Sequence, residues 1–400
     1  MRQNKVQSQI GQNALLLMIS LASVACQVEG ARMGTSSLGI TSQDVKTTAP
    51  SEQSQSQPQA QSQSDSRILI DTTSIGSNQF ILLQPIGTVL MSSSQLKLAD
   101  GNYQITTRFG QGDFGSFQIT NGKVRSATGA LVASEQSISF DPKKLTTLSI
   151  NPSRLSVPIQ GLVNISVHEL GVVAQSAITL HVPNGSYSVL TRNEGATFGS
   201  FDVLDGQVIG THGALSQAGN SVGFDATRLA SVSVDPAVLT VSTQTFAYVR
   251  IADSDSVFNS AVTLFLPDGD FDLETRSGNG KFGGFKVEHA KIVATSEALI
   301  YAGEQIRFDL YRLTSVAVKP VRIQNSAQYA AFSADLPDLS ASFNSAATFY
   351  LPPGKYAVEN VTDQHEYGSL TVYAGGSATT LRTQGQLVTE ASSEVTLELE

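Results

Sequence analysis

The stretch PDGDFDLETR, residues 267–276, sets the pattern of this chain, because it returns three more times at a nearly constant interval. The other copies are ADGNYQITTR (99–108), PNGSYSVLTR (183–192) and PPGKYAVENV (352–361). Their aromatic residues lie 84, 84 and 85 positions apart, at Tyr103, Tyr187, Phe271 and Tyr356. A motif that recurs at a fixed interval of this length is typical of a tandem array of structural repeats.

Two further motifs follow in the same order in each copy. The first reads DFGSF (113–117), TFGSF (197–201), KFGGF (281–285) and EYGSL (366–370). The second reads SISFDPKKLTTLSINP (137–152), SVGFDATRLASVSVDP (221–236) and QIRFDLYRLTSVAVKP (305–320), and EVTLEL (394–399) matches its start in the fourth copy. Together the motifs predict four repeats, over residues 67–150, 151–234, 235–319 and 320–400.

Each repeat has the pattern of short β-strands. In AVTLFLP (261–267), Val262, Leu264 and Leu266 occupy every second position. The pairs Asn121-Gly122 and Asp205-Gly206 stand between such runs and predict tight hairpins. About seven short strands in each repeat predict an all-β chain, a tandem array of four antiparallel, immunoglobulin-like β-sandwich repeats. A propeller in which each repeat supplies two blades remains open as an alternative.

The repeats follow an N-terminal segment with the features of an export signal. Arg2 and Lys5 precede the apolar run ALLLMISLASVA (14–25), which has 12 residues. A membrane span needs about 20 residues, so the run predicts a signal peptide over 1–25. Cys26 ends the sequence SVAC, which resembles a bacterial lipoprotein box and implies lipid attachment at Cys26. Ordinary cleavage after Ala25 is the alternative.

Residues 26–66 predict a disordered linker between this anchor and the repeats. The part SEQSQSQPQAQSQSDS (51–66) has no apolar periodicity and is rich in Gln and Ser. Such a segment buries too little apolar surface to offset its chain entropy. We therefore expect an exported protein of the outer membrane, cell surface or periplasm, with the membrane as partner through a lipid on Cys26.

The repeated turn sequence has a family resemblance. LPDGDFDL (266–273) and LPPGKYAV (351–358) resemble the strand-turn-strand motif of collagen-adhesin B-type and carboxypeptidase-regulatory-like domains. The resemblance covers about ten residues in each repeat. It implies a β-sandwich module with a structural or adhesive role on a bacterial surface.

Composition excludes several classes of protein. The net charge is −9 and no cluster of Lys and Arg is present, which argues against a nucleic-acid partner. Cys26 is the single cysteine, so an intramolecular disulfide and a multi-cysteine zinc site are both excluded. We expect no cofactor and no metal.

The polar residues that draw attention are arginines, histidines and acids. Arg108, Arg192 and Arg276 end the repeated motif, either as a row that binds an acidic glycan or partner, or paired with aspartates of the Phe-Asp step. The aspartates are Asp141, Asp225 and Asp309. The fourth repeat has Val361 for the arginine and Glu398 nearest to the aspartate position, and this joint loss favours the structural pairing.

The remaining candidates are weaker. The five histidines occupy no equivalent positions and are expected on the surface: His168, His181, His212, His289 and His365. Calcium is a possible ligand of repeat three alone, through Asp253, Asp255, Asp268, Asp270 and Asp272. An acid pair for a hydrolase would have to combine a residue such as Glu169 with an acid from the next repeat.

We therefore expect no catalytic residues and no enzyme activity. The predicted function is a non-enzymatic cell-envelope lipoprotein that acts as a binding or adhesion array, with a glycan or a protein on the cell surface as its partner. The alternative is a structural spacer or a subunit of a surface assembly without its own ligand, and an envelope hydrolase is the third interpretation. The residues that would bind a ligand are not identified by the sequence.

Overall fold

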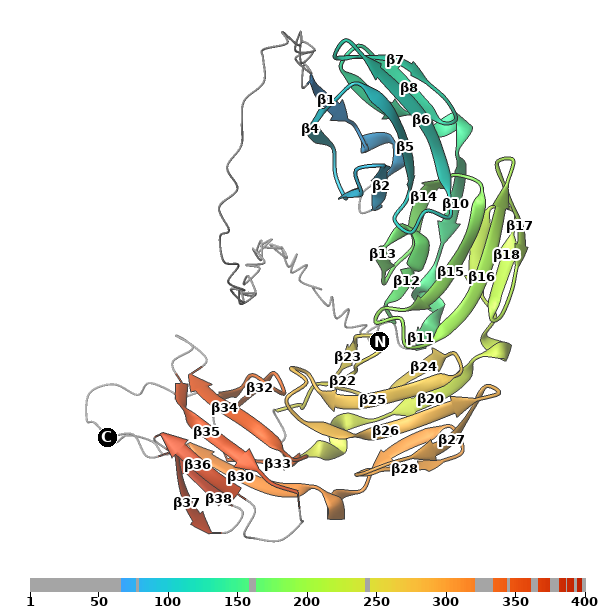
Figure 1. The fold of residues 1–400 in the computed structure, drawn as a ribbon. Helices are drawn as coiled ribbons and strands as arrows, with labels where there is room; N and C mark the ends of the chain where they lie inside the picture. The colour runs from blue at the N-terminus through green and yellow to red at the C-terminus, as the bar shows by residue number, and fades with distance from the viewer. Residues whose placement is uncertain are drawn as a thin grey trace, which may run out of the picture. The chain divides into compact units, whose positions relative to one another are not determined.

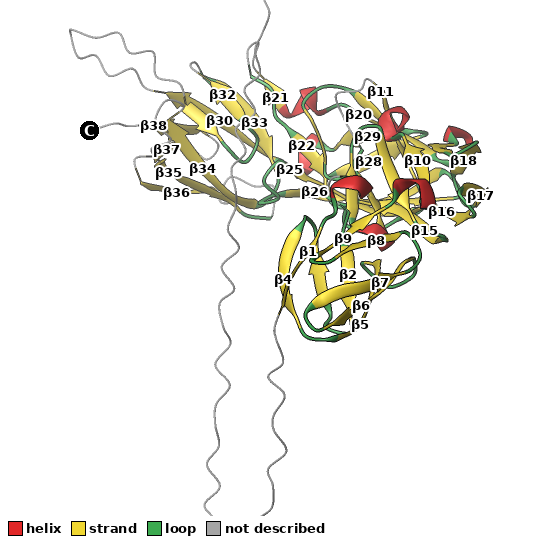
Figure 2. Ribbon diagram, turned by 90° about the horizontal axis from the view of Figure 1, so that it is seen from above, coloured by secondary structure: helices red, strands yellow, loops and turns green. Residues whose placement is uncertain are grey.

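The computed structural model describes residues 66–76, 79–157, 163–241, 245–320, 334–343, 346–360, 366–374, 381–385, 387–391 and 394–397. The predicted signal peptide, Cys26 and all of the predicted linker except Ser66 lie outside these residues. In the described part, strands are joined by turns and by short 3-10 helices only (Figure 2). None of these helices is long and apolar enough to cross a membrane.

The first repeat contains two sheets (Figure 1). The four-stranded sheet has the order β4-β1-β9-β8, with β1 (Ser66–Ile70), β4 (Ser94–Leu98), β8 (Leu131–Ser134) and β9 (Ser137–Phe140). The five-stranded sheet has the order β3-β2-β5-β6-β7, with β2 (Ile81–Gln84), β3 (Thr88–Leu90), β5 (Gly101–Thr107), β6 (Asp113–Thr120) and β7 (Lys123–Ala127).

The same two sheets return in the other repeats. In the second they consist of β10 (Thr146–Ile150), β14 (Ile178–Val182), β18 (Leu215–Ala218) and β19 (Ser221–Phe224), and of β12 (Ile165–Val167), β13 (Val172–Ala174), β15 (Gly185–Thr191), β16 (Thr197–Leu204) and β17 (Gln207–Thr211). In the third they consist of β20 (Ala230–Val234), β24 (Val262–Leu266), β28 (Leu299–Ala302) and β29 (Gln305–Phe308), and of β22 (Val249–Ile251), β23 (Ser256–Phe258), β25 (Gly269–Thr275), β26 (Lys281–Glu288) and β27 (Lys291–Thr295). In the fourth they consist of β30 (Thr314–Pro320), β33 (Ala347–Leu351), β37 (Leu387–Ala391) and β38 (Glu394–Leu397), and of β31 (Ala334–Leu336), β32 (Ala341–Phe343), β34 (Gly354–Asn360), β35 (Glu366–Val372) and β36 (Leu381–Gly385).

This arrangement confirms the predicted all-β class and the antiparallel sandwich. One strand pair in each repeat is parallel, namely the first strand with the last, as in β1 with β9. The described part of each repeat has nine strands of its own rather than about seven. The difference arises from pieces of three or four residues, such as β3 and β8, which are too short to show an alternating pattern.

Strand pairing also shows where the repeats meet. β10, at the end of the predicted repeat 67–150, hydrogen-bonds with β14 and β19 of the second repeat. β20 and β30 likewise join the strands that follow them. The third sequence motif therefore holds the last strand of one repeat and the first strand of the next. The exact domain boundaries stay a prediction.

Each sandwich closes over an aromatic core. In the first repeat, Tyr103 stacks on Phe117 with centroids 5.2 Å apart, and Phe114 meets Phe140 edge to face at 5.1 Å. The second and third repeats contain the equivalent pairs. The first core combines residues of both sheets, for example Ile68 and Ile105, which are fully buried. One core enclosed between two sheets is a sandwich and not a pair of propeller blades.

The repeated Phe-Gly step has a steric cause. Gly199 has φ of 150°, and a Cβ atom at this position would collide with the carbonyl oxygen of His212. Gly115, Gly283 and Gly368 face the same obstruction. Only glycine allows the strand to approach this carbonyl so closely. The predicted hairpin turns are also present, with Asn121 and Gly122 both at positive φ (50° and 72°).

Candidate functional site

The arginine row does not form the predicted pairs. Asp141, Asp225 and Asp309 instead cap short 3-10 helices, η2 (Pro142–Lys144), η5 (Ala226–Arg228) and η7 (Leu310–Arg312). Asp225 and Asp309 also pair with the arginine three positions later, Arg228 and Arg312. The structural pairing was therefore wrong, because a capping aspartate satisfies its carboxylate locally.

The three arginines reach the next repeat. Arg192 of repeat two forms an ion pair with Asp255 of repeat three, and Arg276 donates to Ser340 Oγ of repeat four. Arg108 lies 5.1 Å from the centroid of Phe80 and 5.0 Å from that of Phe109, against Gly171 of repeat two. Gly171, Asp255 and Ser340 are equivalent residues, all left-handed with φ of 64°, 48° and 47°. The arginines thus join repeats.

A backbone hydrogen bond accompanies each arginine. The amides of Phe80, Asn164 and Tyr248 donate to the carbonyls of Leu170, Ser254 and Leu339, at 2.9, 3.1 and 2.8 Å. Donors and acceptors lie at equivalent positions of successive repeats. Each junction between repeats therefore has one shared backbone contact, around which different side chains are placed.

An acid recurs at each junction, and the sequence interpretation did not recognise it. Glu169 accepts from Ser188 N at 2.7 Å and Ser188 Oγ at 2.9 Å, and is 3% exposed. Asp338 accepts from Ala357 N at 3.2 Å, and from two side chains of repeat three, Ser277 and Asn279. Asp253 occupies the same position in repeat three. The interval of 84 and 85 residues would have identified these acids.

Asp253 differs from the other two acids in its surroundings. Burial raises the pKa of its carboxyl group, and the charges of Asp272 and Glu274 raise it further. Asp272 stands where repeat two has Ser188, which donates to Glu169. Glu169 was the acid named for a possible hydrolase site, and its carboxylate instead holds β15 in place.

The chain segments after β10 and β20 link the repeats further. We call residues 152–157 and 236–241 the arms. Each begins with a 3-10 helix, η3 (Pro152–Leu155) or η6 (Pro236–Leu239), capped by Asn151 or Asp235. Each then adds a two-residue strand to the next repeat: β11 (Ser156–Val157) pairs with β24, and β21 (Thr240–Val241) pairs with β33. Leu155 and Leu239 are buried at 1% exposure.

The histidines have separate surroundings. His168, in η4 (His168–Leu170), stacks on Phe109 of the first repeat at 4.3 Å and is part of a junction, which the surface prediction did not anticipate. His181 bonds to Thr147, and His212 lies 3.4 Å from Asp202. His289 is exposed in a hairpin turn. His365 lies outside the described residues.

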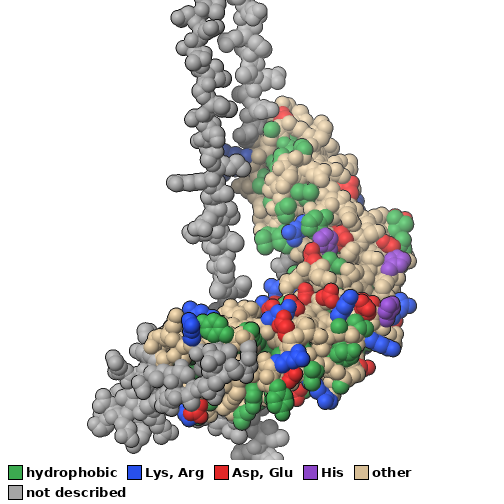
Figure 3. All heavy atoms as spheres, turned by 60° about the horizontal axis from the view of Figure 1, so that its bottom comes forward, with side chains coloured by type: hydrophobic (Ala, Val, Ile, Leu, Met, Phe, Trp, Pro, Cys, Tyr) green, Lys and Arg blue, Asp and Glu red, His purple; other side chains and the backbone are tan. Residues whose placement is uncertain are grey.

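The aspartates considered for calcium serve other contacts. Asp268 accepts from the amides of His289 and Ala290, and Asp272 pairs with Lys281 at 2.9 Å. Within the described ranges, no group of three or more His, Cys, Asp or Glu side chains is arranged to hold a metal ion. On the face shown in Figure 3, basic and acidic side chains are scattered rather than separated by sign.

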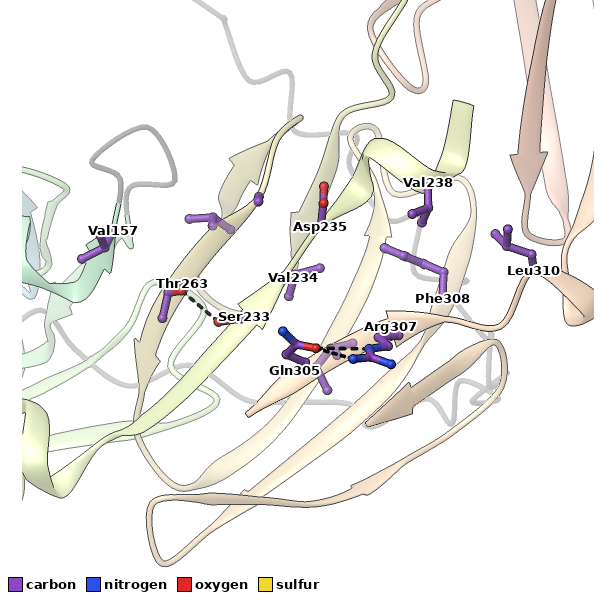
Figure 4. A pocket seen from close by; sticks show the side chains of 13 residues that line it. Val157, Ser233, Val234, Asp235, Val238, Thr263, Gln305, Arg307, Phe308 and Leu310 are labelled. Atoms are coloured by element: carbon purple, nitrogen blue, oxygen red, sulfur yellow. Dashed lines mark hydrogen bonds between the residues drawn. The ribbon is translucent and has the colours of Figure 1, made fainter. Parts of the chain in front are cut away.

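A groove of about 570 Å³ lies on the sheet β11-β24-β20-β29-β28, which repeat three completes with β11. We call it the repeat-3 groove (Figure 4). Ser233 Oγ and Thr263 Oγ1 lie 2.8 Å apart on its floor, and Arg307 donates to Gln305 Oε1 from Nη2 at 2.7 Å. Its lining also includes Val157 of β11, Asp235, Val238, Phe308 and Leu310.

Comparisons with known proteins add little. No protein-family model matches the sequence, and no curated protein does. A solved structure with partial similarity is the Bacillus anthracis TIE protein, at 10% identity and a TM-score of 0.12, covering 84% of this chain and 68% of that one. At this TM-score the likeness carries no argument.

Proposed function

We propose that this chain is a non-enzymatic binding array of the cell envelope, anchored by a lipid on Cys26. The proposal combines the export signal of the sequence with the way the repeats are joined. It includes the resemblance to collagen-adhesin B-type and carboxypeptidase-regulatory-like modules, which rests on the repeated turn sequence alone.

The observation that carries the proposal is that core and junction residues recur from repeat to repeat, whereas outward-facing residues differ. The aromatic core, the Phe-Gly step and the junction amides recur in successive repeats. Outward positions vary: Ser221 and Gly223 of β19 correspond to Gln305 and Arg307 of β29. A constant scaffold with variable exterior positions is typical of repeat proteins that bind partners.

A structural spacer is the second candidate, and the junctions favour it as well. Sequence analysis offered the three arginines as binding groups, but their side chains form contacts at the junctions between repeats. If every outward difference were incidental, the array would hold a partner module at a distance and bind nothing itself.

The anchor is tested by labelled-lipid incorporation and membrane fractionation of the full chain. Wild-type protein should incorporate the label and sediment with membranes, and Cys26→Ser should do neither. A wild-type protein that is soluble and unlabelled would contradict the anchor. Binding of the full chain to envelope extracts then separates a binding array from a spacer.

A further inference from the structure

The repeat-3 groove combines a polar floor with apolar walls. Ser233 and Thr263 are half-buried on the floor, beside Gln305 and Arg307, which are exposed. Val157 is 58% exposed and Val238 46% exposed at the sides. A concave surface of about 570 Å³ with a few polar groups between apolar ones has the size and composition of a small-molecule or oligomer site.

Two polar residues of the groove differ from their equivalents in repeats one and two. Gln305 and Arg307 correspond to Ser221 and Gly223 in repeat two. In repeat one the same two positions hold serines, Ser137 and Ser139. Short side chains there provide neither the amide nor the guanidinium. The amide and the guanidinium on the floor are therefore absent from the equivalent positions of repeats one and two.

The polar groups suit a ligand with many hydroxyls and no net charge. Arg307 brings one positive charge and Asp235 one negative charge to the lining. Guanidinium and amide groups donate hydrogen bonds, while carboxylate and hydroxyl oxygens accept them. The groove can therefore form hydrogen bonds with both hydroxyl groups of a vicinal diol in a sugar. Because Asp235 lies in the same groove as Arg307, a polyanion would be repelled at one side of it.

A lining residue of the groove is followed in the chain by an exposed aromatic residue. Tyr311 follows the lining residue Leu310 in η7 and is 96% exposed. Repeats one and two have Lys143 and Thr227 at this position. A tyrosine ring offers a flat apolar face and a hydroxyl at low entropic cost, which suits the carbon face of a sugar ring.

The alternative of an added peptide strand is disfavoured at this place. β24 pairs with β20 along one edge, and its other edge is already paired with β11, through Ser156 with Leu264 and Val157 with Thr263. A peptide that extends a sheet needs an unpaired edge strand. The groove lies on the face of the sheet, where side chains and not backbone groups meet a ligand (Figure 4).

From these contacts we propose that the repeat-3 groove binds a neutral polysaccharide, with Gln305, Arg307 and Tyr311 as the contacting residues. This proposal rests on the proposed binding function and names its ligand class and site. The groove holds a short stretch of the polymer, with sugar hydroxyls on Arg307, Gln305 and Asp235 and a ring face on Tyr311.

The test is retardation of the full chain in native gels that contain dextran, laminarin or galactomannan. Wild-type protein should be retarded by at least one of them. The variant Gln305→Ser/Arg307→Ser/Tyr311→Thr takes residues that other repeats carry, and all three sites are exposed, so it should fold normally and bind at least about tenfold more weakly. The matched control is Arg125→Ser, an exposed strand arginine of repeat one, which should bind as wild type.

Three outcomes would overturn the proposal. They are no retardation by any neutral polymer, equal retardation of the triple variant, and preferential retardation by polygalacturonate, an acidic polymer. None of them bears on the anchor, because lipid incorporation at Cys26 and binding to envelope extracts are measured separately. If the wild-type chain binds one of the neutral polymers but does not bind envelope extracts, the proposed function is rejected and the groove as a polysaccharide site is not.

Discussion

Gly112 of the first repeat lies against the hydroxyl group of Tyr187 of the second, and a Cβ atom at Gly112 would come within 2.8 Å of Tyr187 Oη. Tyr187 donates to Pro183 O at 2.8 Å and is fully buried. At the third junction, Gly280 faces Tyr356 in the same way. At the second junction the aromatic residue is Phe271, which has no hydroxyl, and the facing residue is Ala196.

The first prediction is that these two positions are coupled. Gly112→Ala alone should lower the free energy of unfolding by about 1–3 kcal/mol, because the new methyl group overpacks the junction. Tyr187→Phe alone should lower it by about 1 kcal/mol through the lost hydrogen bond. The double variant reproduces the Ala196–Phe271 combination. Its loss of unfolding free energy should therefore be smaller than the sum of the two single losses by at least about 0.5 kcal/mol.

Denaturant unfolding of the four proteins gives the coupling energy. Gly210→Ala is the control, since a Cβ there meets nothing within 4 Å. Strict additivity of Gly112→Ala and Tyr187→Phe would show that the Gly–Tyr and Ala–Phe combinations are unrelated.

The second prediction concerns the ion pair between Arg192 and Asp255. Their side chains are 45% and 30% exposed, so the pair should contribute about 0.5–1 kcal/mol. A double-mutant cycle with Arg192→Met and Asp255→Ser should measure this coupling at low salt. At 1 M NaCl the coupling should fall, because charges at the surface are screened.

Arg108→Met provides the comparison for this cycle. The contacts of Arg108 with described residues are packing contacts on two aromatic rings and Gly171, which salt should affect little. A coupling of Arg192 with Asp255 that is zero at low salt, or unchanged by salt, would contradict the assigned ion pair.

The fold was predictable to the extent that its causes are local. Alternation in strands, the hairpin at Asn121-Gly122 and the aromatic core are determined within a few residues or by one interval. The partners of Arg192 and Arg276 could not be predicted in this way, because the contacting residues lie 63 and 64 positions away in another repeat. The aspartates of the Phe-Asp step lie nearer in sequence to these arginines, but they cap short 3-10 helices, and a capping aspartate has no distinct sequence pattern there.

The repeat-3 groove could not be predicted from the sequence either. Its lining combines Val157 of one arm with Val238 of the next arm, with the cap residue Asp235, and with β29, which begins 70 residues after Asp235. No periodic pattern brings these segments together. The sequence does contain one usable sign, which is that Gln305, Arg307 and Tyr311 differ from the residues at the equivalent positions of repeats one and two.

The third prediction concerns the hairpin turn of repeat three. His289 and Ala290 hold positive φ angles of 52° and 57°, where the first repeat has Asn121-Gly122. Alanine in the left-handed region costs about 1 kcal/mol relative to glycine. Ala290→Gly should therefore raise the free energy of unfolding by about 1 kcal/mol, measured by thermal or denaturant unfolding. Gly122→Ala is the reciprocal control and should lower it, and a destabilised Ala290→Gly protein would refute the strain at this turn.

The last prediction is a pH-dependent effect at Asp253. Its pKa is raised in the folded protein, so the ionised carboxylate opposes folding at neutral pH, and this cost disappears as the pH falls through the folded-state pKa. Asp253→Asn should raise the melting temperature at pH 7, and the gain should vanish below about pH 4, where the carboxyl group of the unfolded chain is also protonated. Asp338→Asn is the matched control: Asp338 accepts from Ser277, Asn279 and the amide of Ala357, so its replacement should lower the melting temperature. A destabilised Asp253→Asn protein at pH 7 would mean that the backbone hydrogen bonds from Asp272 and Asp253, which lower the pKa of this carboxyl group, outweigh its burial and the charges of Asp272 and Glu274.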